Sequence, residues 1–387
     1  MRPRWTRGEL ALALLLVLTT AGCGLGVYLL LASRSTAAPQ TARRPTEVKP
    51  AAPDAPINRL PGTLYLAQGG ALYQLQGGRF AAFLPPAGWT QPAMAPGSQE
   101  MVAVKRGADF SDLFLVGLDG QVRDQLTQDD HGGLEKNHWA FYPRFAPDGK
   151  SIFLSYDSPK AGYEVDFSVW SMPIAGDVEQ GVRWTAPNSY TGGDVQPLPL
   201  ASGALLYAKY SLVNDHVTSQ IWISDAPGSP GRPLTPAEQD CSQPALSPDG
   251  SRLAMVCSGD RQSGTLVVAA FDGGNLGAPL SVASGRLLAQ PTWAPDGTGL
   301  VYLAPAAAAG LFQLWWVGAP SLPAAAQGAG DEVQGSAGGS LGSDLWQLTP
   351  GASGGRSSAP TPPPALPAPV QLTQSLDLDA TSTIAWR

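Results

Sequence analysis

The chain has 387 residues, of which 43% are hydrophobic and only 14% are charged, and its formal net charge is −7. This length can bury one large core, and the 45 Gly and 37 Pro residues favour tight turns between short strands over helices, whose interiors both residues disrupt. The acidic balance, without a cluster of Lys and Arg, argues against nucleic acid as a partner.

The N-terminus carries an apolar segment. Residues 10–32 form an uncharged run long enough to cross a bilayer, and Arg2, Arg4 and Arg7 precede it. Because the tail before the run is very short, we expect a signal-anchor transmembrane helix within residues 1–32, with the remainder of the chain extracytoplasmic at the cell membrane of a bacterium. Residues 33–59, rich in Ala and Pro, are predicted to form an extended tether.

A second interpretation of the same segment is a lipoprotein signal. Thr20-Ala21-Gly22-Cys23 is similar to a bacterial lipobox, in which Cys23 would be lipidated after cleavage, although Thr stands where Leu is usual. The apolar run also continues through residues 27–32, where a lipoprotein normally turns polar. We favour the single-pass helix, with lipidation of Cys23 and simple secretion as the alternatives.

One phrase recurs along the middle of the chain. Its strong copies occupy residues 142–149, 243–250 and 290–297 and end in Ala/Ser-Pro-Asp-Gly, and weaker copies occupy 91–97 and 196–203. The leading prolines of successive copies are 47 to 54 residues apart. A repeat of this length, with four strand-like runs around each copy, is typical of β-propeller blades. Pro presets φ for the hairpin turn, Asp bonds nearby amides, and Gly accepts the positive φ that closes it.

The two ends of the domain complement each other. Residues 62–67, 71–76 and 79–84 are predicted to form three strands of a blade without a first strand, whereas residues 381–387 resemble a first strand without the rest. Joining them closes the ring. We therefore predict an all-β, six-bladed propeller over residues 60–387, with a composite blade made from both termini. A low-complexity insertion at about 318–369 interrupts blade six, whose outer strand ends either at Leu348-Thr349 or at Leu372-Thr373.

Two cysteines flank one of the hairpin turns. Cys241 and Cys257 lie eight residues on either side of Asp249, so in a tight hairpin they would face each other across two strands at disulfide distance. A disulfide would support export to an oxidising compartment. The alternative is a pair of buried free thiols.

The phrase Pro-x-Φ-Ser/Ala-Pro-Asp-Gly, followed by an aromatic-rich strand and a Leu-Thr ending, resembles the repeat of TolB-like, WD40-like (PD40) propellers. Similar blades accompany the hydrolase domain of prolyl oligopeptidase-like enzymes, and we expect no such domain in this chain. The resemblance covers about residues 60–387. It implies a scaffold outside the cytoplasm that binds protein or ligand.

No catalytic motif is expected to function here, and we predict no cofactor. The pattern Gly-x-Ser-x-Gly occurs at 338–342 and 351–355, but both copies fall in the low-complexity insertion, where no strand-turn-helix can form around the Ser. Metal-binding motifs of zinc or EF-hand spacing are lacking. Asp377, Asp379 and Thr381, or Asp129 with its neighbours, offer oxygen ligands for calcium without that spacing, and we predict no metal.

Candidate binding residues lie on predicted loops at one end of the propeller, opposite the Pro-Asp-Gly turns. An acidic, aromatic-lined funnel there would bind a cationic peptide, a protein segment or a glycan of the envelope. The alternatives are polar residues that simply occupy loops, a hydrolase or lyase that uses His and acidic residues in the funnel, and an extracytoplasmic sensor. The candidate residues are Asp129, Asp130, His131, His138, Trp139, Tyr163, Tyr190, Asp215, His216 and Asp240.

Overall fold

The computed structural model describes residues 55–160, 163–176, 178–259, 263–306, 310–320 and 368–387, and the structural statements below concern these residues alone. The predicted anchor (1–32), Cys23, most of the predicted tether and both Gly-x-Ser-x-Gly copies lie outside the described residues. No helix in the described part of the chain has the length and apolar character needed to cross a membrane.

The described residues form six four-stranded antiparallel sheets, each of which is one blade. The prediction of an all-β, six-bladed propeller is therefore confirmed. Three short 3₁₀ helices accompany the strands: η1 (Pro56–Arg59), η2 (Val178–Gln180) and η3 (Ala237–Gln239). The strands of blades one to three are β1 (Leu64–Gln68), β2 (Ala71–Gln76), β3 (Arg79–Leu84), β4 (Trp89–Met94), β5 (Glu100–Arg106), β6 (Ser111–Gly117), β7 (Val122–Gln125), β8 (Ala140–Phe145), β9 (Ser151–Tyr156), β10 (Ser168–Pro173) and β11 (Val182–Arg183). Those of blades four to six are β12 (Asp194–Pro199), β13 (Leu205–Val213), β14 (His216–Ser224), β15 (Arg232–Pro233), β16 (Cys241–Leu246), β17 (Arg252–Cys257), β18 (Gly264–Ala270), β19 (Leu280–Gly285), β20 (Ala289–Trp293), β21 (Gly299–Pro305), β22 (Phe312–Gly318) and β23 (Val370–Gln371), and β24 (Ala385–Trp386) completes blade one.

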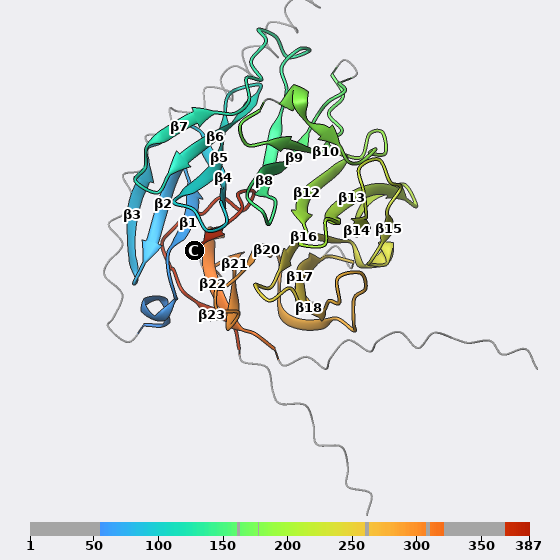
Figure 1. Ribbon diagram of the computed structural model, residues 1–387. Helices are drawn as coiled ribbons and strands as arrows, with labels where there is room; N and C mark the ends of the chain where they lie inside the picture. The colour runs from blue at the N-terminus through green and yellow to red at the C-terminus, as the bar shows by residue number, and fades with distance from the viewer. Residues whose placement is uncertain (1–54, 161–162, 177, 260–262, 307–309, 321–367) are drawn as a thin grey trace, which may run out of the picture. The chain divides into compact units, whose positions relative to one another are not determined.

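The blades stand around a central axis (Figure 1). The first strand of each blade is innermost, and neighbouring inner strands contact each other in the order β4, β8, β12, β16, β20 and β24, after which β24 contacts β4 again. The ring is thus closed. Loops that join one blade to the next, and loops between the second and third strands of a blade, lie at one end of the axis, which we call the loop face.

Blade one is composite, with the sheet order β24-β1-β2-β3. β24 pairs with β1 so that Trp386 lies opposite Leu64, and Thr63 exchanges two backbone hydrogen bonds with Arg387, of 2.7 and 3.0 Å. Ahead of this blade, Ile57 in η1 is buried and packs into the core. The folded domain therefore includes a few residues that precede residue 60.

Each repeat phrase begins with a kink in an inner strand. Five residues that precede the leading prolines have positive φ, between 47° and 58°: Gln91, Tyr142, Gln196, Gln243 and Gln290. The register of the inner strand shifts at each of them. Because Pro cannot donate a ladder hydrogen bond, it is tolerated at such a bulge. A left-handed residue other than Gly costs roughly 1–2 kcal/mol, so something must stabilise each bulge.

Side chains of the bulge residues provide that stabilisation by linking neighbouring blades. Gln243 Oε1 accepts a hydrogen bond of 2.6 Å from the backbone amide of Gln290, and Gln196 Oε1 accepts one of 2.8 Å from Gln243. In blade two, Gln91 Oε1 accepts from the amide of Tyr142 at 2.6 Å. These bonds form a girdle of side chains around the axis. The leading part of the repeat phrase therefore joins blades, while its Asp-Gly end closes hairpins.

The Leu-Thr endings also have a structural role. Each Thr hydroxyl accepts a hydrogen bond from a backbone amide of the third strand of its blade, where the short outer strand has ended: Leu113 to Thr127, Ile221 to Thr235 and Leu314 to Thr373, at 2.9–3.0 Å. In blade six, β23 immediately precedes Leu372-Thr373 and pairs with β22. Of the two predicted endings of blade six, this one is present among the described residues, and Leu348-Thr349 lies outside them.

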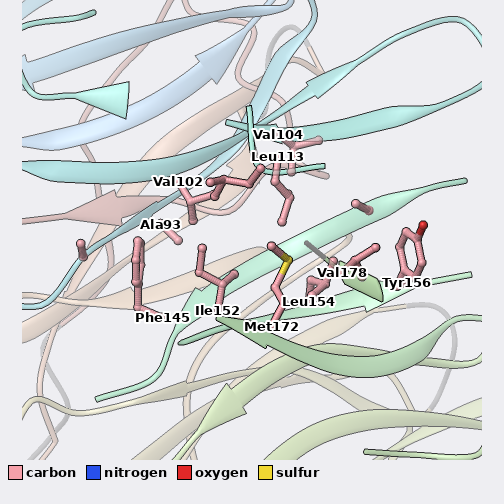
Figure 2. Packing of buried hydrophobic residues seen from close by; sticks show 13 residues of the cluster. Ala93, Val102, Val104, Leu113, Phe145, Ile152, Leu154, Tyr156, Met172 and Val178 are labelled. Atoms are coloured by element: carbon pink, nitrogen blue, oxygen red, sulfur yellow. The ribbon is translucent and has the colours of Figure 1, made fainter. Parts of the chain in front are cut away.

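Apolar residues fill the space between successive blades. Figure 2 shows the cluster between blades two and three, where Val102 and Leu113 of one blade face Ile152 and Leu154 of the next. All four side chains are fully buried. Burial of such a side chain contributes on the order of 2 kcal/mol. The packing between blades therefore stabilises the ring.

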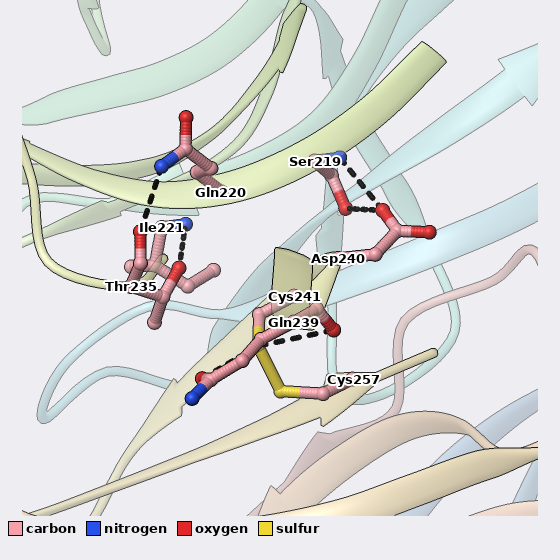
Figure 3. The surroundings of a disulfide bond; sticks show 8 residues. All are labelled: Ser219, Gln220, Ile221, Thr235, Gln239, Asp240, Cys241 and Cys257. Atoms are coloured by element: carbon pink, nitrogen blue, oxygen red, sulfur yellow. Dashed lines mark hydrogen bonds between the residues drawn. A yellow bond between two sulfur atoms is a disulfide. The ribbon is translucent and has the colours of Figure 1, made fainter. Parts of the chain in front are cut away.

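Cys241 and Cys257 form a disulfide between β16 and β17 (Figure 3). They lie directly opposite each other in the strand register, and 16 residues separate them in the chain. The arrangement follows from the symmetric placement of the two residues about the Asp249 turn. It ties the innermost strand of blade five to its neighbour.

Candidate functional site

One cavity of the loop face is an aromatic-walled pocket of about 550 Å³. It lies against blades two, three and four near the axis. We call it the loop-face pocket. Its lining residues come from the ends of inner strands, from loops and from the segment that precedes β24: Gly70, Gly88, Trp89, Thr90, Gln91, Arg106, Gly107, Trp139, Phe141, Tyr142, Val165, Phe167, Gly192, Val195, Tyr210, Asp379 and Thr381.

Its walls are built from stacked rings. The Trp139 and Phe141 rings stack with their centroids 5.5 Å apart, and Phe167 meets Phe141 edge-on at 5.8 Å. These rings are partly exposed. Since residues two apart on a strand share one face, Trp139 and Phe141 are presented together where β8 begins. Aromatic surfaces of this kind bind apolar side chains and sugar rings.

Two charged residues line the pocket. The Arg106 guanidinium lies over the Trp139 ring, 5.5 Å from its centroid, and no carboxylate of the described residues forms an ion pair with it. Asp379 accepts hydrogen bonds from Thr90 at 3.2 Å and from the Thr381 hydroxyl at 2.6 Å. Asp379 is thus held by Thr90 of β4 and by its own loop, whereas the exposed Arg106 is available to a ligand that carries a carboxylate.

The pocket opens where the glutamine girdle is interrupted. Blade three has Tyr142 in the position that Gln occupies in blades two, four, five and six, and Tyr142 lines the pocket floor together with Gln91. Burial raises the pKa of the Tyr142 phenol to about 12, and the charge of Asp379 acts in the same direction. The phenol therefore stays neutral and presents a hydrogen-bonding hydroxyl.

Most of the residues suggested from the sequence lie on the loop face but outside this pocket. Of the ten, only Trp139 lines it. His131, His138 and Asp129 occupy the loop between β7 and β8. Tyr163 lies between β9 and β10, and Tyr190 between β11 and β12. Asp215 and His216 are at the β13–β14 turn, and their side chains are exposed.

One group of these residues forms a connected polar network beside blade three. His138 Nδ1 donates a hydrogen bond of 2.9 Å to Asp157 Oδ1, which also accepts the Trp139 amide at 2.9 Å. Lys160 Nζ lies 3.5 Å from the other oxygen of Asp157. The His131 and His138 rings are 6.1 Å apart. No hydrogen bond or ring contact within the described chain joins His216 to this pair.

Asp129 is buried beneath that network. Its Oδ1 accepts a 2.7 Å hydrogen bond from the Tyr156 hydroxyl, and Oδ2 has no hydrogen-bond partner among the described residues. Burial raises the pKa of Asp129 to about 6, with the negative charge of Asp112 acting in the same direction. The side chain organises the loop ahead of β8 and does not reach the pocket.

The remaining candidates serve local structure or are free at the surface. Asp240 Oδ1 accepts hydrogen bonds of 2.7 and 2.9 Å from the amide and hydroxyl of Ser219 (Figure 3). The Tyr163 hydroxyl donates to Glu135, and the Tyr190 amide donates to Asp166 at 2.7 Å. Asp130 Oδ1 accepts from the Gly132 amide at 3.2 Å. Among the described residues, no three His, Cys, Asp or Glu side chains gather as a metal site.

Exposed apolar side chains lie on the same face of blades three and four as the pocket. Six of the ten exposed large hydrophobic residues found in the described chain lie on the loop face of blades three and four: Leu134, Tyr163, Val165, Tyr190, Leu212 and Val217. Val165 belongs both to this group and to the pocket wall. We call these six residues the apolar rim. Exposed apolar side chains on the same face as a pocket are typical of a surface that binds another protein.

Sequence reasoning did not single out Arg106 or Phe167. Both lie at the loop-face ends of strands, Arg106 as the last residue of β5 and Phe167 just before β10. The signal was their position: in an antiparallel blade, the last residue of the second strand and the residue before the third strand reach the same face as the blade-to-blade loops. A search by strand end would have found them, whereas a search for polar loop residues did not.

Residues 226–314 match the family model described as the lipoprotein LpqB β-propeller domain. A segment of 87 residues is 29% identical to the uncharacterized peptidase YuxL of Bacillus subtilis, and it spans 22% of this chain and 13% of that protein.

The fold resembles that of TolB from Acinetobacter baumannii, with a TM-score of 0.51 and 18% identity, over 65% of this chain and 60% of the TolB chain. A putative TolB from Agrobacterium tumefaciens matches with a TM-score of 0.47 and 13% identity, over 67% of this chain and 85% of that one. The domain therefore has a six-bladed β-propeller fold like that of TolB.

Proposed function

We propose that this chain is a non-catalytic binding protein of the cell envelope, whose loop-face pocket and apolar rim bind a segment of another protein. The observation that carries the proposal is that Val165 belongs both to the aromatic pocket, which has Arg106 at its wall, and to the apolar rim on the same face of blades three and four. A small ligand would use the pocket alone. A peptide segment uses both, with one side chain inserted among the rings and flanking residues lying on the rim.

Charge defines the segment further. Arg106 has no carboxylate partner and stacks on Trp139, so its guanidinium edge is directed by the stacking and can pair with a carboxylate in a bidentate manner. The preferred segment therefore carries an aromatic or aliphatic side chain next to an acidic residue or a C-terminal carboxylate. This segment differs from the cationic ligand that the acidic loops suggested. The reason is that the pocket wall carries aromatic rings and the Arg106 side chain, which has no acidic partner among the described residues.

Two observations support a location at the envelope. The matched family model describes a lipoprotein domain, and a disulfide joins Cys241 and Cys257, which is typical of an exported protein. We propose that the propeller stands outside the membrane, attached through residues 1–32 as a helix or through a lipid on Cys23. Intact mass spectrometry of the chain purified from membranes separates the two, because lipidation removes residues 1–22 and adds acyl chains to Cys23, and Cys23→Ser prevents both.

The binding proposal can be tested by selection. A phage-displayed random peptide library is panned on the full chain in detergent, and recovered phage are tested on Trp139→Ala and Arg106→Ala variants. Val122→Ala and Arg79→Ala serve as matched controls, because both residues are exposed and lie outside the pocket. We expect enriched peptides that share an apolar–acidic pattern and lose binding only to the pocket variants. The proposal would be contradicted if no peptide were enriched, or if the enriched peptides bound all variants equally. It would also be contradicted if the protein bound glycans on an array and bound no peptide.

A hydrolase or lyase is the second candidate, and the His138–Asp157 pair favours it. The 2.9 Å bond between the two side chains is the arrangement by which a carboxylate orients a catalytic imidazole. His138 is only partly buried, and Asp129 beneath it has a pKa of about 6. Turnover of a lactone or glycan panel that is lost in His138→Gln and kept in Trp139→Ala would establish this candidate in place of the first.

A further inference from the structure

The central channel holds a second, much smaller cavity, and one positively charged side chain lines it. Beneath the loop-face pocket, a space of about 20 Å³ is lined by inner-strand residues of several blades: Tyr142, Arg144, Gln196, Pro197, Gln243, Pro244, Gln290, Pro291 and Thr383. Arg144 is the single charged residue among them. The cavity is of the size of one water molecule or one monatomic ion.

Arg144 occupies a position at which the other blades have no charge. It is the third residue of the repeat phrase, where Ala93, Leu198, Ala245 and Thr292 stand in the neighbouring blades. The bulge at Tyr142 directs this part of β8 toward the axis. One blade thus places a guanidinium in a channel that is otherwise lined by amide, hydroxyl and proline groups.

The guanidinium has no partner in the described chain. No hydrogen bond joins it to an acceptor, and no carboxylate lies within ion-pair distance. Burial lowers the pKa of Arg144, and no neighbouring charge opposes that effect. Because an Arg side chain keeps its proton in proteins, the positive charge persists inside the channel. The Arg144 side chain is partly exposed to the channel. A cation without a counter-charge in such a confined space would be stabilised by a ligand of opposite sign.

Donors of the girdle point to the same kind of ligand. Gln243 uses its Oε1 to accept the Gln290 amide at 2.6 Å, which leaves its side-chain NH₂ without an acceptor among the described residues. Gln290, by contrast, donates its NH₂ to the Ala380 carbonyl at 3.1 Å. The channel wall thus presents NH donors from Arg144 and Gln243 around a space for one small particle.

We propose that the axial cavity is a binding site for a monatomic anion, chloride under physiological conditions, held by Arg144 with help from the Gln243 amide. The volume excludes polyatomic anions such as phosphate, and the guanidinium excludes cations. The anion would neutralise Arg144 and tie blade three to blades four and five at the axis. Tyr142 lines both this cavity and the loop-face pocket, so the site would stiffen the pocket floor. The inference is independent of what the loop face binds.

The site is tested by thermal unfolding of the full chain in detergent, with sodium chloride or bromide compared with sodium gluconate at equal ionic strength. We expect the melting temperature to rise with either halide by about 2–4 °C for each tenfold increase above the dissociation constant, and to be independent of gluconate. Arg144→Gln should abolish the halide response, whereas Arg79→Gln, an exposed control, should keep it.

A second measurement does not depend on any variant folding. Crystals of the wild-type chain soaked in bromide should show one anomalous peak on the axis next to Arg144. Equal melting temperatures in chloride and gluconate would show that the channel holds only water, and a halide response that survives in Arg144→Gln would place the anion elsewhere. Either result, or bromide peaks at the surface alone, would overturn the proposal.

Discussion

Ser382 Oγ accepts a 2.7 Å hydrogen bond from the backbone amide of Gln91, although 291 residues separate the two in the chain. Ser382 thereby takes the place in the composite blade that a girdle glutamine takes in blades two, four and five. Its neighbour Thr383 donates its hydroxyl hydrogen to the Pro92 carbonyl at 3.0 Å. Residues 382–387 therefore complete the sheet of blade one, and they also continue the ring of hydrogen bonds around the axis.

Removal of this closure should destabilise the whole domain. Deletion of residues 381–387 eliminates β24, exposes the edge of β1 and leaves blades two and six without an inner neighbour, so we expect a large fall in melting temperature with loss of cooperativity. Ser382→Ala should cost about 1–2 kcal/mol in urea unfolding, because the buried Gln91 amide loses its acceptor. Ser375→Ala, an exposed control on the same segment, should be neutral. An unchanged unfolding curve after the deletion would refute closure by the C-terminus.

The hydroxyl of Thr235 should matter, and that of Thr218 should not. Thr235 accepts the Ile221 amide at 3.0 Å (Figure 3), whereas the buried Thr218 hydroxyl has no partner in the described chain. We expect Thr235→Val to lower the free energy of unfolding by about 1–3 kcal/mol through an unsatisfied amide, and Thr218→Val to be neutral or stabilising. Chemical denaturation of both variants measures this. Equal effects of the two substitutions would show that the hydrogen bond from the Ile221 amide to the Thr235 hydroxyl contributes nothing to stability.

Reduction of the disulfide should weaken the domain without changing its fold. A cross-link that closes a loop of 16 residues stabilises a protein by about 3 kcal/mol through its effect on the unfolded chain. We expect dithiothreitol to lower the melting temperature of the wild type, and to have no effect on a Cys241→Ser/Cys257→Ser variant, which melts like the reduced wild type. If reductant shifts the double variant as well, the effect does not arise from this bond.

Asp129 should make stability fall as pH rises. Its folded pKa of about 6 lies above the ordinary value of 3.8, so the folded chain holds the proton more tightly than the unfolded chain does. Its contribution is therefore fully present below pH 4 and is lost as pH rises through 6. Between pH 7.5 and pH 4.5 we expect the wild type to gain about 2 kcal/mol relative to Asp129→Asn. A constant difference between the two proteins across this range would contradict the raised pKa.

The repeat phrase allowed the architecture to be predicted, because each copy encodes a local turn and a fixed spacing that do not depend on distant residues. The pairing of Cys241 with Cys257 followed for the same reason. The pocket depends instead on where strand ends converge after the ring closes. Arg106 and Phe167 belong to different blades and share no motif, so nothing local marks them.

Polar loop residues were a poor guide for a physical reason. Loops must satisfy their own backbone groups, and Asp240 and Asp166 do so through hydrogen bonds to nearby amides. His138 is held by Asp157 in the same way. A better signal was present in the repeat itself: Tyr142 and Arg144 replace the residues of the other copies, and both line cavities of the axis.

The affinity of the loop-face pocket for a selected peptide tests the central claim most directly. The dissociation constant of one enriched peptide is measured by calorimetry for the wild type, Trp139→Ala, Arg106→Ala and the controls Val122→Ala and Arg79→Ala. We expect binding to weaken about tenfold or more in each pocket variant and by less than about twofold in each control. Equal affinities across all five proteins would contradict binding at this pocket.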